Sequence, residues 1–90
     1  MTPTTFPGKT VLVTGAANSI GRAIVTAFHR AGASVAFCDT DSSAAEDLCN
    51  QLPGLFFQPV DVTDVPALEA FIDSVYTRVG DIDILVNNVG

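Results

Sequence analysis

The chain has 90 residues, enough for one small domain or for part of a larger one. Hydrophobic residues make up 48% of it and charged residues only 16%, a composition too apolar for a disordered chain. Four basic residues against ten acidic ones give a net charge of −6, which argues against binding to nucleic acids or anionic membranes. A bound phosphate would therefore have to rely on backbone amides rather than on a basic patch.

The cysteine pattern and the hydropathy pattern both point to a reduced, soluble protein. Cys38 and Cys49 have neither the spacing of a metal site nor that of a disulfide framework. The N-terminal stretch lacks the apolar segment of a signal peptide, and no run is long enough to cross a bilayer. We therefore expect a cytoplasmic protein with no metal site, no membrane contact and no nucleic-acid partner.

The first predicted strand covers residues 10–13, an apolar run that leads into Thr14-Gly15. The first predicted helix covers residues 19–31 and ends at Gly32, which suits the left-handed conformation common after a helix. Its apolar residues share one face, which we expect to be buried: Ile20, Ile24, Ala27, Phe28 and Ala31.

The second predicted strand covers residues 33–38, another apolar run. Ser43 and Glu46 have the spacing of a capping box, which predicts a second helix from this point to about Leu52. A Pro-Gly pair then separates this helix from the next strand.

The third predicted strand covers residues 55–60. Thr63 or Asp64 can cap a third helix, in which a proline at position 66 is tolerated within the first turn. Gly80 ends this helix, and residues 82–86 form a fourth apolar strand. The third helix carries a long apolar stripe at helical spacing: Leu68, Phe71, Ile72, Val75 and Val79.

The predicted element order is therefore β-α-β-α-β-α-β. Apolar strands that alternate with amphipathic helices indicate a parallel sheet joined by right-handed crossovers. The sequence thus predicts an α/β fold without an internal linker or repeat.

The turn after the first strand has the features of a phosphate-binding loop. In a parallel α/β unit it leads into a helix N-terminus, whose free amides and positive dipole end can receive a phosphate. Gly15 and Gly21 are placed to let the backbone approach a ligand and to let the helix lie against the strand. A purely structural turn would share this spacing, so the loop alone leaves both interpretations open.

Two polar positions after the next strands extend the pattern. Asp39 lies 18 residues after Gly21, where a carboxylate can accept hydrogen bonds from both hydroxyls of an adenosine ribose. It would also repel a 2′-phosphate, and the residues that follow it, Thr40 and Asp41, supply no positive charge. The pair Asp61-Val62 after the third strand can meet an adenine ring. Taken singly, Asp39 could be a solvated turn residue and Asp61-Val62 an ordinary strand end.

Together these residues resemble the N-terminal half of a short-chain dehydrogenase/reductase, from about Gly8 onward. The family's motif Thr-Gly-x-x-x-Gly-x-Gly is matched by Thr14, Gly15 and Gly21, and its ribose-binding acid by Asp39. The resemblance implies a Rossmann-type three-layer fold with a partial parallel sheet in the order 3-2-1-4. It also implies that residues 1–90 are an incomplete NAD(P)-binding domain that lacks the C-terminal half.

The remaining family motifs follow in the same order. Asp61-Val62 matches the adenine contact, and residues 87–90 match the family's Asn-Asn-Ala-Gly motif, with Val89 in place of alanine. With Asp39 as the ribose acid, the resemblance implies that NAD is preferred over NADP. It implies the following cofactor-binding residues: Thr14, Gly15, Asn18, Ser19, Ile20, Gly21, Asp39, Asp61, Val62, Asn87, Val89 and Gly90.

Ser19 departs from the family motif, which has its middle glycine at this position. If the backbone there needs a positive φ, a serine costs about 1 kcal/mol. Its hydroxyl could instead bind a phosphate oxygen or cap the helix. We therefore expect cofactor binding to be weakened at most.

The family's catalytic pair, a tyrosine with a lysine four positions later, has no match in these residues. The tyrosine acts as acid and base beside the nicotinamide, with its pKa lowered by the lysine. Here Tyr76 is the sole tyrosine, residue 80 is Gly80, and Lys9 is the sole lysine. We assign no catalytic residue, and expect Tyr76 to be a half-buried packing residue.

Two further side chains invite an interpretation. His29 is expected to be solvated, without a chemical role. Arg22 follows the glycine turn and could either approach a phosphate or lie on the helix surface.

Two functions remain open from the sequence. The chain is either the NAD-binding portion of an oxidoreductase acting on alcohols or carbonyls, or a truncated, non-catalytic module that binds nucleotides or oligomerises. In the family's strand order the fourth strand is central, so we expect it to form an open apolar edge here. Self-association through this strand or through the uncovered sheet face is therefore expected.

Overall fold

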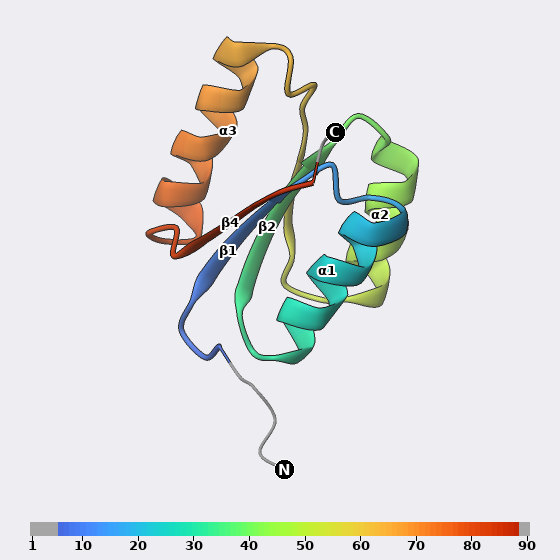
Figure 1. Cartoon of the computed structure of the whole chain (residues 1–90), viewed down its shortest axis with the longest axis vertical. Coiled ribbons are helices and arrows are strands. Elements are labelled where there is room, and N and C mark those ends of the chain that lie inside the picture. The colour runs from blue at the N-terminus through green and yellow to red at the C-terminus, as the bar shows by residue number, and fades with distance from the viewer. Residues whose placement is uncertain (1–5, 89–90) are drawn as a thin grey trace.

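The computed structural model describes residues 6–88, which form a four-stranded parallel sheet with helices on both faces (Figure 1). The elements are β1 (Thr10–Thr14), α1 (Ser19–Arg30), β2 (Ser34–Asp39), α2 (Ser42–Gln51), β3 (Phe56–Pro59), α3 (Val65–Arg78) and β4 (Ile84–Asn87). The strand order is β3-β2-β1-β4. Helices α1 and α2 cover one face and α3 covers the other (Figure 1). The predicted α/β fold, element order and strand order are confirmed.

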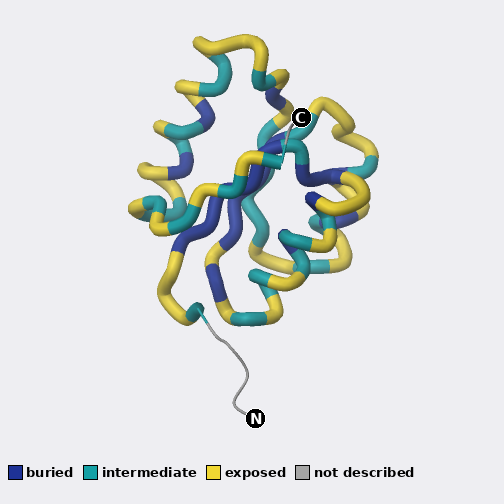
Figure 2. The backbone as a smooth tube through the Cα atoms, viewed as in Figure 1, coloured by how far each residue is buried: buried dark blue, intermediate teal, exposed yellow. Residues whose placement is uncertain are grey.

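The sheet separates two hydrophobic clusters, and its two central strands, β1 and β2, are the most buried strands (Figure 2). Val11 and Val13 of β1 face α1 and α2, whereas Leu12 between them faces α3. This alternation follows from the period of two along a strand. In α3, Phe71 and Val75 are fully buried, with Leu68, Ile72 and Val79 partly buried beside them, so the predicted stripe is confirmed.

The parallel register places the carboxyl ends of the four strands together at one end of the sheet. Thr14 pairs with Cys38 of β2 and with Asn87 of β4, and Asp39 pairs with Pro59 of β3. Because all pairs are parallel, the loops that follow the strands emerge at the same end. This end is where the candidate site lies.

The buried face of α1 agrees with the predicted one only in part, since Ile24 and Phe28 are partly buried and pack against the core. Ile20 is 70% exposed and Ala27 is also exposed, whereas Gly21 and Val25 are buried. The helix is rotated so that Gly21 lies against the turn after β1, where a side chain would not fit. Close backbone packing at one residue therefore decides which face of the helix meets the sheet.

Of the caps of the two later helices, the sequence predicted one of two candidates correctly for α3 and the wrong residue for α2. Helix α2 begins at Ser42, and the Asp41 carboxylate caps it by accepting a hydrogen bond of 3.0 Å from the Ala44 amide. The predicted capping box from Ser43 is wrong, because the chain turns into the helix directly after β2. For α3, Asp64 rather than Thr63 is the cap and accepts from the Ala67 amide.

Strand β4 begins two residues later than predicted. The Asp83 carboxylate accepts a hydrogen bond of 2.9 Å from the Thr10 amide, and the Asp83 amide donates to the Thr10 carbonyl. A side-chain oxygen thus replaces a backbone carbonyl at the start of the ladder. No helix among residues 6–88 is long and apolar enough to cross a membrane.

Candidate functional site

A cleft of about 450 Å³ lies at the carboxyl ends of the strands. Its lining residues come from the loops after all four strands: Gly15, Asp39, Thr40, Val60, Asp61, Val62, Thr63 and Asn88. The cleft brings together four of the predicted site residues and adds Thr40, Val60, Thr63 and Asn88, which were not predicted.

The glycine turn after β1 is held close to β2 and to α1. Gly15 has a φ of 65°, in the left-handed region, and its amide donates to the Cys38 carbonyl at 2.9 Å. A Cβ atom added to Gly21 would lie 2.4 Å from the Gly15 carbonyl oxygen and 2.7 Å from Asn88 Nδ2. Glycine is therefore required at position 21 for the helix to approach the turn.

Among residues 6–88, no side chain caps the N-terminus of α1. The first bond of the helix runs from the Arg22 amide to the Asn18 carbonyl at 3.3 Å, so the amides of residues 19–21 precede it. Asn18 itself caps no amide, in contrast to the aspartates that cap α2 and α3. These amides, at the positive end of the helix dipole, suit a phosphate group.

Ser19 has a φ of 54°, which is the only positive φ at a non-glycine residue among residues 6–88. The condition under which a serine is costly at this position, a positive φ, is therefore met. The side-chain hydrogen bonds of this turn run through Asn18 and Asp39, so the serine does not act as a helix cap.

Asp39 links the glycine turn to the start of α2. Its Oδ2 accepts a hydrogen bond of 2.9 Å from the Ala17 amide, and its Oδ1 accepts one of 3.0 Å from the Asp41 amide. A carboxylate has about four acceptor positions, so both oxygens can still receive a hydroxyl hydrogen. The residue is held in place and remains partly exposed beside the cleft.

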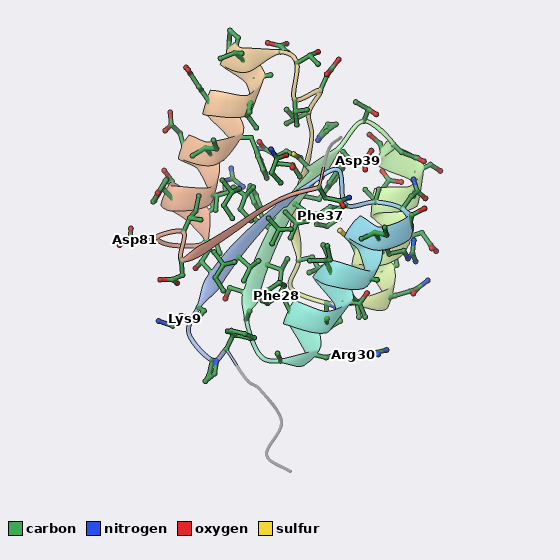
Figure 3. All side chains as sticks on the ribbon, in the orientation of Figure 1. Lys9, Phe28, Arg30, Phe37, Asp39 and Asp81 are labelled. Atoms are coloured by element: carbon green, nitrogen blue, oxygen red, sulfur yellow. The ribbon has the colours of Figure 1, made fainter. Side chains whose placement is uncertain are left out.

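The surroundings of Asp39 are acidic. Asp41 binds Asn18 Nδ2 through its Oδ2 at 3.0 Å. Hydrogen bonds from the Ala44 amide and from Asn18 hold the pKa of the Asp41 carboxyl below its usual value. Lys9 and Arg30 lie at the opposite end of the sheet from Asp39 (Figure 3).

Arg22 is paired with α2 rather than directed toward the cleft. Its Nη2 donates to Asp47 Oδ2 at 2.9 Å, which supports the helix-surface interpretation of this residue.

Asp61 forms a tight turn with Thr63 on the β3 side of the cleft. Its Oδ1 accepts two hydrogen bonds, one of 2.7 Å from Thr63 Oγ1 and one of 2.9 Å from the Thr63 amide. Both bonds lower the pKa of the Asp61 carboxyl, and the bond from the Thr63 hydroxyl has the larger effect. Val62, between the two, packs against the cluster beneath α3.

The end of β4 supports the glycine turn from the other side. Thr14 Oγ1 donates to Asn87 Oδ1 at 2.9 Å, and the Asn88 amide donates to Thr14 Oγ1 at 3.2 Å. Asn88 Nδ2 donates to the Gly15 carbonyl at 2.9 Å. Asn88 was not predicted as a site residue, although it lies within the motif of residues 87–90. Val89 and Gly90 lie outside the described residues.

The other polar side chains lie away from the cleft lining. His29 is partly exposed, and its Nε2 lies 2.8 Å from the Pro53 carbonyl oxygen at the surface. Tyr76 is 50% exposed. Burial raises the pKa of the Cys38 and Cys49 thiols. Residues 6–88 contain no group of three potential metal ligands.

Comparison with known proteins gives a consistent match over nearly the whole chain. The family model described as short chain dehydrogenase matches residues 9–90. An L-fucose dehydrogenase from Mus musculus is 42% identical over 87 residues, which are 97% of this chain and 32% of that protein. The short chain dehydrogenase/reductase dpmpG from Macrophomina phaseolina is 38% identical, and the match covers 51% of that protein.

A solved structure is similar in fold as well as in sequence. The 2-keto-3-deoxy-D-gluconate dehydrogenase from Streptococcus agalactiae superposes with a TM-score of 0.87 at 37% identity. The match covers 97% of this chain and 34% of that one. The chain thus spans about a third of the length of this structure and of the mouse relative.

Proposed function

Since the chain belongs to the short-chain dehydrogenase family, we propose that it is the NAD-binding portion of an oxidoreductase acting on alcohols or carbonyls. Membership of this family implies a dinucleotide cofactor, NAD or NADP. The observation that carries the proposal is the cleft at the strand ends, which is lined by Gly15 of the turn that leads into α1. Residues 1–90 would then be the first part of a larger cofactor-binding domain.

Each part of the cofactor has a suitable group in this chain. The amides of residues 19–21 would hold the pyrophosphate. Asp39 would accept the hydroxyls of the adenosine ribose, and the loop of residues 60–63 would meet the base. When bound, the cofactor supplies or accepts the hydride. The glycine turn, braced by Thr14, Asn87 and Asn88, would keep the nicotinamide half in a fixed direction.

A preference for NAD over NADP follows from charge. A 2′-phosphate would lie against the Asp39 carboxylate, with the Asp41 carboxylate next to it. Arg22, a nearby cation, is engaged by Asp47. Repulsion without a compensating cation supports NAD as the cofactor.

The names of two relatives support the class of substrate. L-fucose and 2-keto-3-deoxy-D-gluconate are a sugar and a sugar acid, and both relatives are dehydrogenases by name. We therefore propose an alcohol or carbonyl group as the site of hydride transfer.

The alternative is a non-catalytic module that binds nucleotides or associates with a second copy. It is favoured by one observation, namely that Leu85 of the edge strand β4 is 62% exposed. The oxidoreductase portion and the nucleotide-binding form of the alternative both require the cleft to bind a dinucleotide, so binding is the first property to test.

The test is isothermal titration of the chain with NAD⁺ and with NADP⁺. We expect NAD⁺ to bind at least about tenfold more tightly, a difference of about 1.4 kcal/mol. Asp39→Asn removes the charge and should bring the two affinities together, whereas the control Asp73→Asn, at an exposed position of α3, should not. Tighter binding of NADP⁺, or no binding of either, would contradict the proposal.

A further inference from the structure

Strand β4 is paired on one side and open on the other. Within residues 6–88 its hydrogen-bonded neighbour is β1, and no described strand lies on its outer side. An edge strand presents N–H and C=O groups with which another strand can pair. Ile84 and Val86 of β4 are partly buried against the cluster beneath α1 and α2, whereas Leu85 is 62% exposed. Both the backbone and one large apolar side chain of β4 are thus open to a further contact.

Helix α3 leaves the surface beside Leu85 uncovered. Phe71 of α3 stacks on Phe56 of β3, with ring centroids 6.2 Å apart, and it belongs to a cluster with residues of β1 and β2. No residue of β4 belongs to this cluster, although Leu85 is in register with Leu12 and so points to the same face. The face around Leu85 therefore has room for the side chain of a neighbouring strand.

The charges around β4 favour an antiparallel neighbour. Asp81 and Asp83 precede the strand, and its last residue, Asn87, is neutral. Two copies paired in parallel would bring their aspartates together, which is unfavourable because like charges repel. In an antiparallel pair centred on Leu85, the two copies of Asp83 are about 14 Å apart along the strands, which exceeds the screening length of about 8 Å at physiological salt. Each Asp83 then lies opposite a neutral Asn87.

The faces of the strand decide the register. Residues directly opposite in an antiparallel pair point to the same face of the sheet. Centring the pair on Leu85 places the two leucines together on the face of α3, and Ile84 opposite Val86 on the other face. Centring it on Ile84 would place Leu85 opposite Asp83, and centring it on Val86 would place Leu85 opposite Asn87. Only the first register gives each apolar residue of β4 an apolar neighbour.

We propose that a second copy of this chain pairs with β4 in antiparallel orientation, with Leu85 opposite its counterpart. A twofold axis perpendicular to the sheet relates the copies and joins the two four-stranded sheets into one. The clefts at the carboxyl ends of the strands then face opposite ends of this sheet, so both stay free for a cofactor. The inference rests on the self-associating form of the alternative function, and it is independent of dinucleotide binding.

The experiment reads the register from disulfides between copies. Ile84, Leu85 and Val86 are changed one at a time to cysteine in a Cys49→Ser background, in which the remaining Cys38 is buried. Each variant is incubated with oxidised glutathione, and covalent dimers are measured by electrophoresis without reductant. In the proposed register the Cα atoms of the two copies of residue 85 are about 5 Å apart, a distance that a disulfide can bridge. Those of residue 84, or of residue 86, are about 8 Å apart, which is too far.

Leu85→Cys should therefore form covalent dimers at least about tenfold faster than Ile84→Cys or Val86→Cys. A mixture of Ile84→Cys and Val86→Cys should give a mixed dimer, identified by its mass, because these positions lie opposite each other. The control Ala23→Cys, at an exposed position of α1, should dimerise only as slowly as the two non-matching variants. Circular dichroism of the reduced variants reports whether the fold is retained, and the mixed dimer tests the register without altering Leu85.

The outcomes distinguish this inference from the proposed function. Faster dimer formation by Ile84→Cys or Val86→Cys than by Leu85→Cys would show another register and overturn the inference. Equal rates for all variants, Ala23→Cys included, would show random collision and overturn it as well. The covalent Leu85→Cys dimer should bind NAD⁺ within about twofold of the reduced protein, and loss of binding on cross-linking would contradict the proposed arrangement. Failure of both forms to bind NAD⁺, with the expected disulfides, would overturn the proposed function alone.

Discussion

Ser19 adopts a left-handed backbone conformation at the first turn of α1. In this conformation Cβ approaches the following carbonyl oxygen, which costs about 1–2 kcal/mol. The neighbouring Asn18 and Asp39 make the side-chain hydrogen bonds of the turn, so the serine does not recover this cost through a cap. The turn is thus slightly strained at the residue closest to the proposed phosphate site.

Ser19→Gly should raise the free energy of unfolding by about 0.5 kcal/mol. Relief of about 1–2 kcal/mol of strain is partly offset by the greater entropy of glycine in the unfolded chain, up to about 1 kcal/mol. Urea unfolding measures the difference. Ser19→Ala retains Cβ and should gain nothing, so equal stabilisation by both substitutions would contradict the explanation.

Some site residues could be predicted from the sequence because their roles depend on local position. Asp39 follows a strand directly, and Gly21 lies at a fixed distance from Gly15. Thr63 was considered only as a helix cap, and Asn88 was not predicted because its role arises from a hydrogen bond between distant parts of the chain. Asn88 binds the Gly15 carbonyl across 73 positions of sequence, a contact that no local pattern contains.

At the scale of elements, hydrophobic patterns predicted the four strands and the helices α1 and α3, but only part of the buried face of α1. The predicted face included Ile20, which is exposed, because periodicity takes no account of the backbone contact at Gly21. Helix starts were predicted less well, since several polar residues compete for each cap. At α2 the aspartate nearest to β2 is the cap, two residues before the predicted serine.

Asp41→Ala should lower the thermal midpoint of the chain, because it removes the cap of α2 and the link to Asn18. Ser43→Ala should leave the midpoint nearly unchanged, although the sequence pattern favoured Ser43 as the cap. A larger fall in the thermal midpoint for Ser43→Ala than for Asp41→Ala would show that the Asp41 cap contributes little.

The effect of Asp41→Ala should depend on pH. The pKa of Asp41 in the folded chain lies below its usual value of 3.8. A depressed pKa means that the stabilisation is present above 3.8 and is lost as the pH falls through the folded value. Thermal melts of the unmodified chain and of Asp41→Ala should therefore differ in midpoint at pH 6, and this difference should shrink at pH 3. A constant difference would indicate that the charge is not involved.

At the scale of the whole molecule, the carboxyl ends of the strands carry the cleft and a group of carboxylates, whereas Lys9 and Arg30 lie at the other end (Figure 3). Strand β4 is an edge of the sheet, with β1 as its neighbour. Leu85 of β4 pairs with Leu12, whose side chain faces α3, yet Leu85 is 62% exposed. An edge of this kind favours pairing with a second strand.

We propose self-association of the chain through the exposed edge strand β4. Sedimentation at micromolar concentration should show species larger than the monomer. Leu85→Lys should shift the distribution toward the monomer, because a charged side chain blunts an exposed edge. Ala23→Lys adds the same charge at an exposed position of α1 and should not. A stable monomer whose β4 amides are protected from exchange would contradict the proposal.

The central claim is that a dinucleotide binds at the carboxyl ends of the strands, with its phosphates at the N-terminus of α1. It is tested most directly by amide NMR spectra of the chain recorded during titration with NAD⁺. The amides of Ser19, Ile20 and Gly21 should show the largest shifts, together with those of Val62 and Thr63. Shifts confined to the opposite end of the sheet, around Lys9 and Gly32, or no shifts at all, would contradict the account.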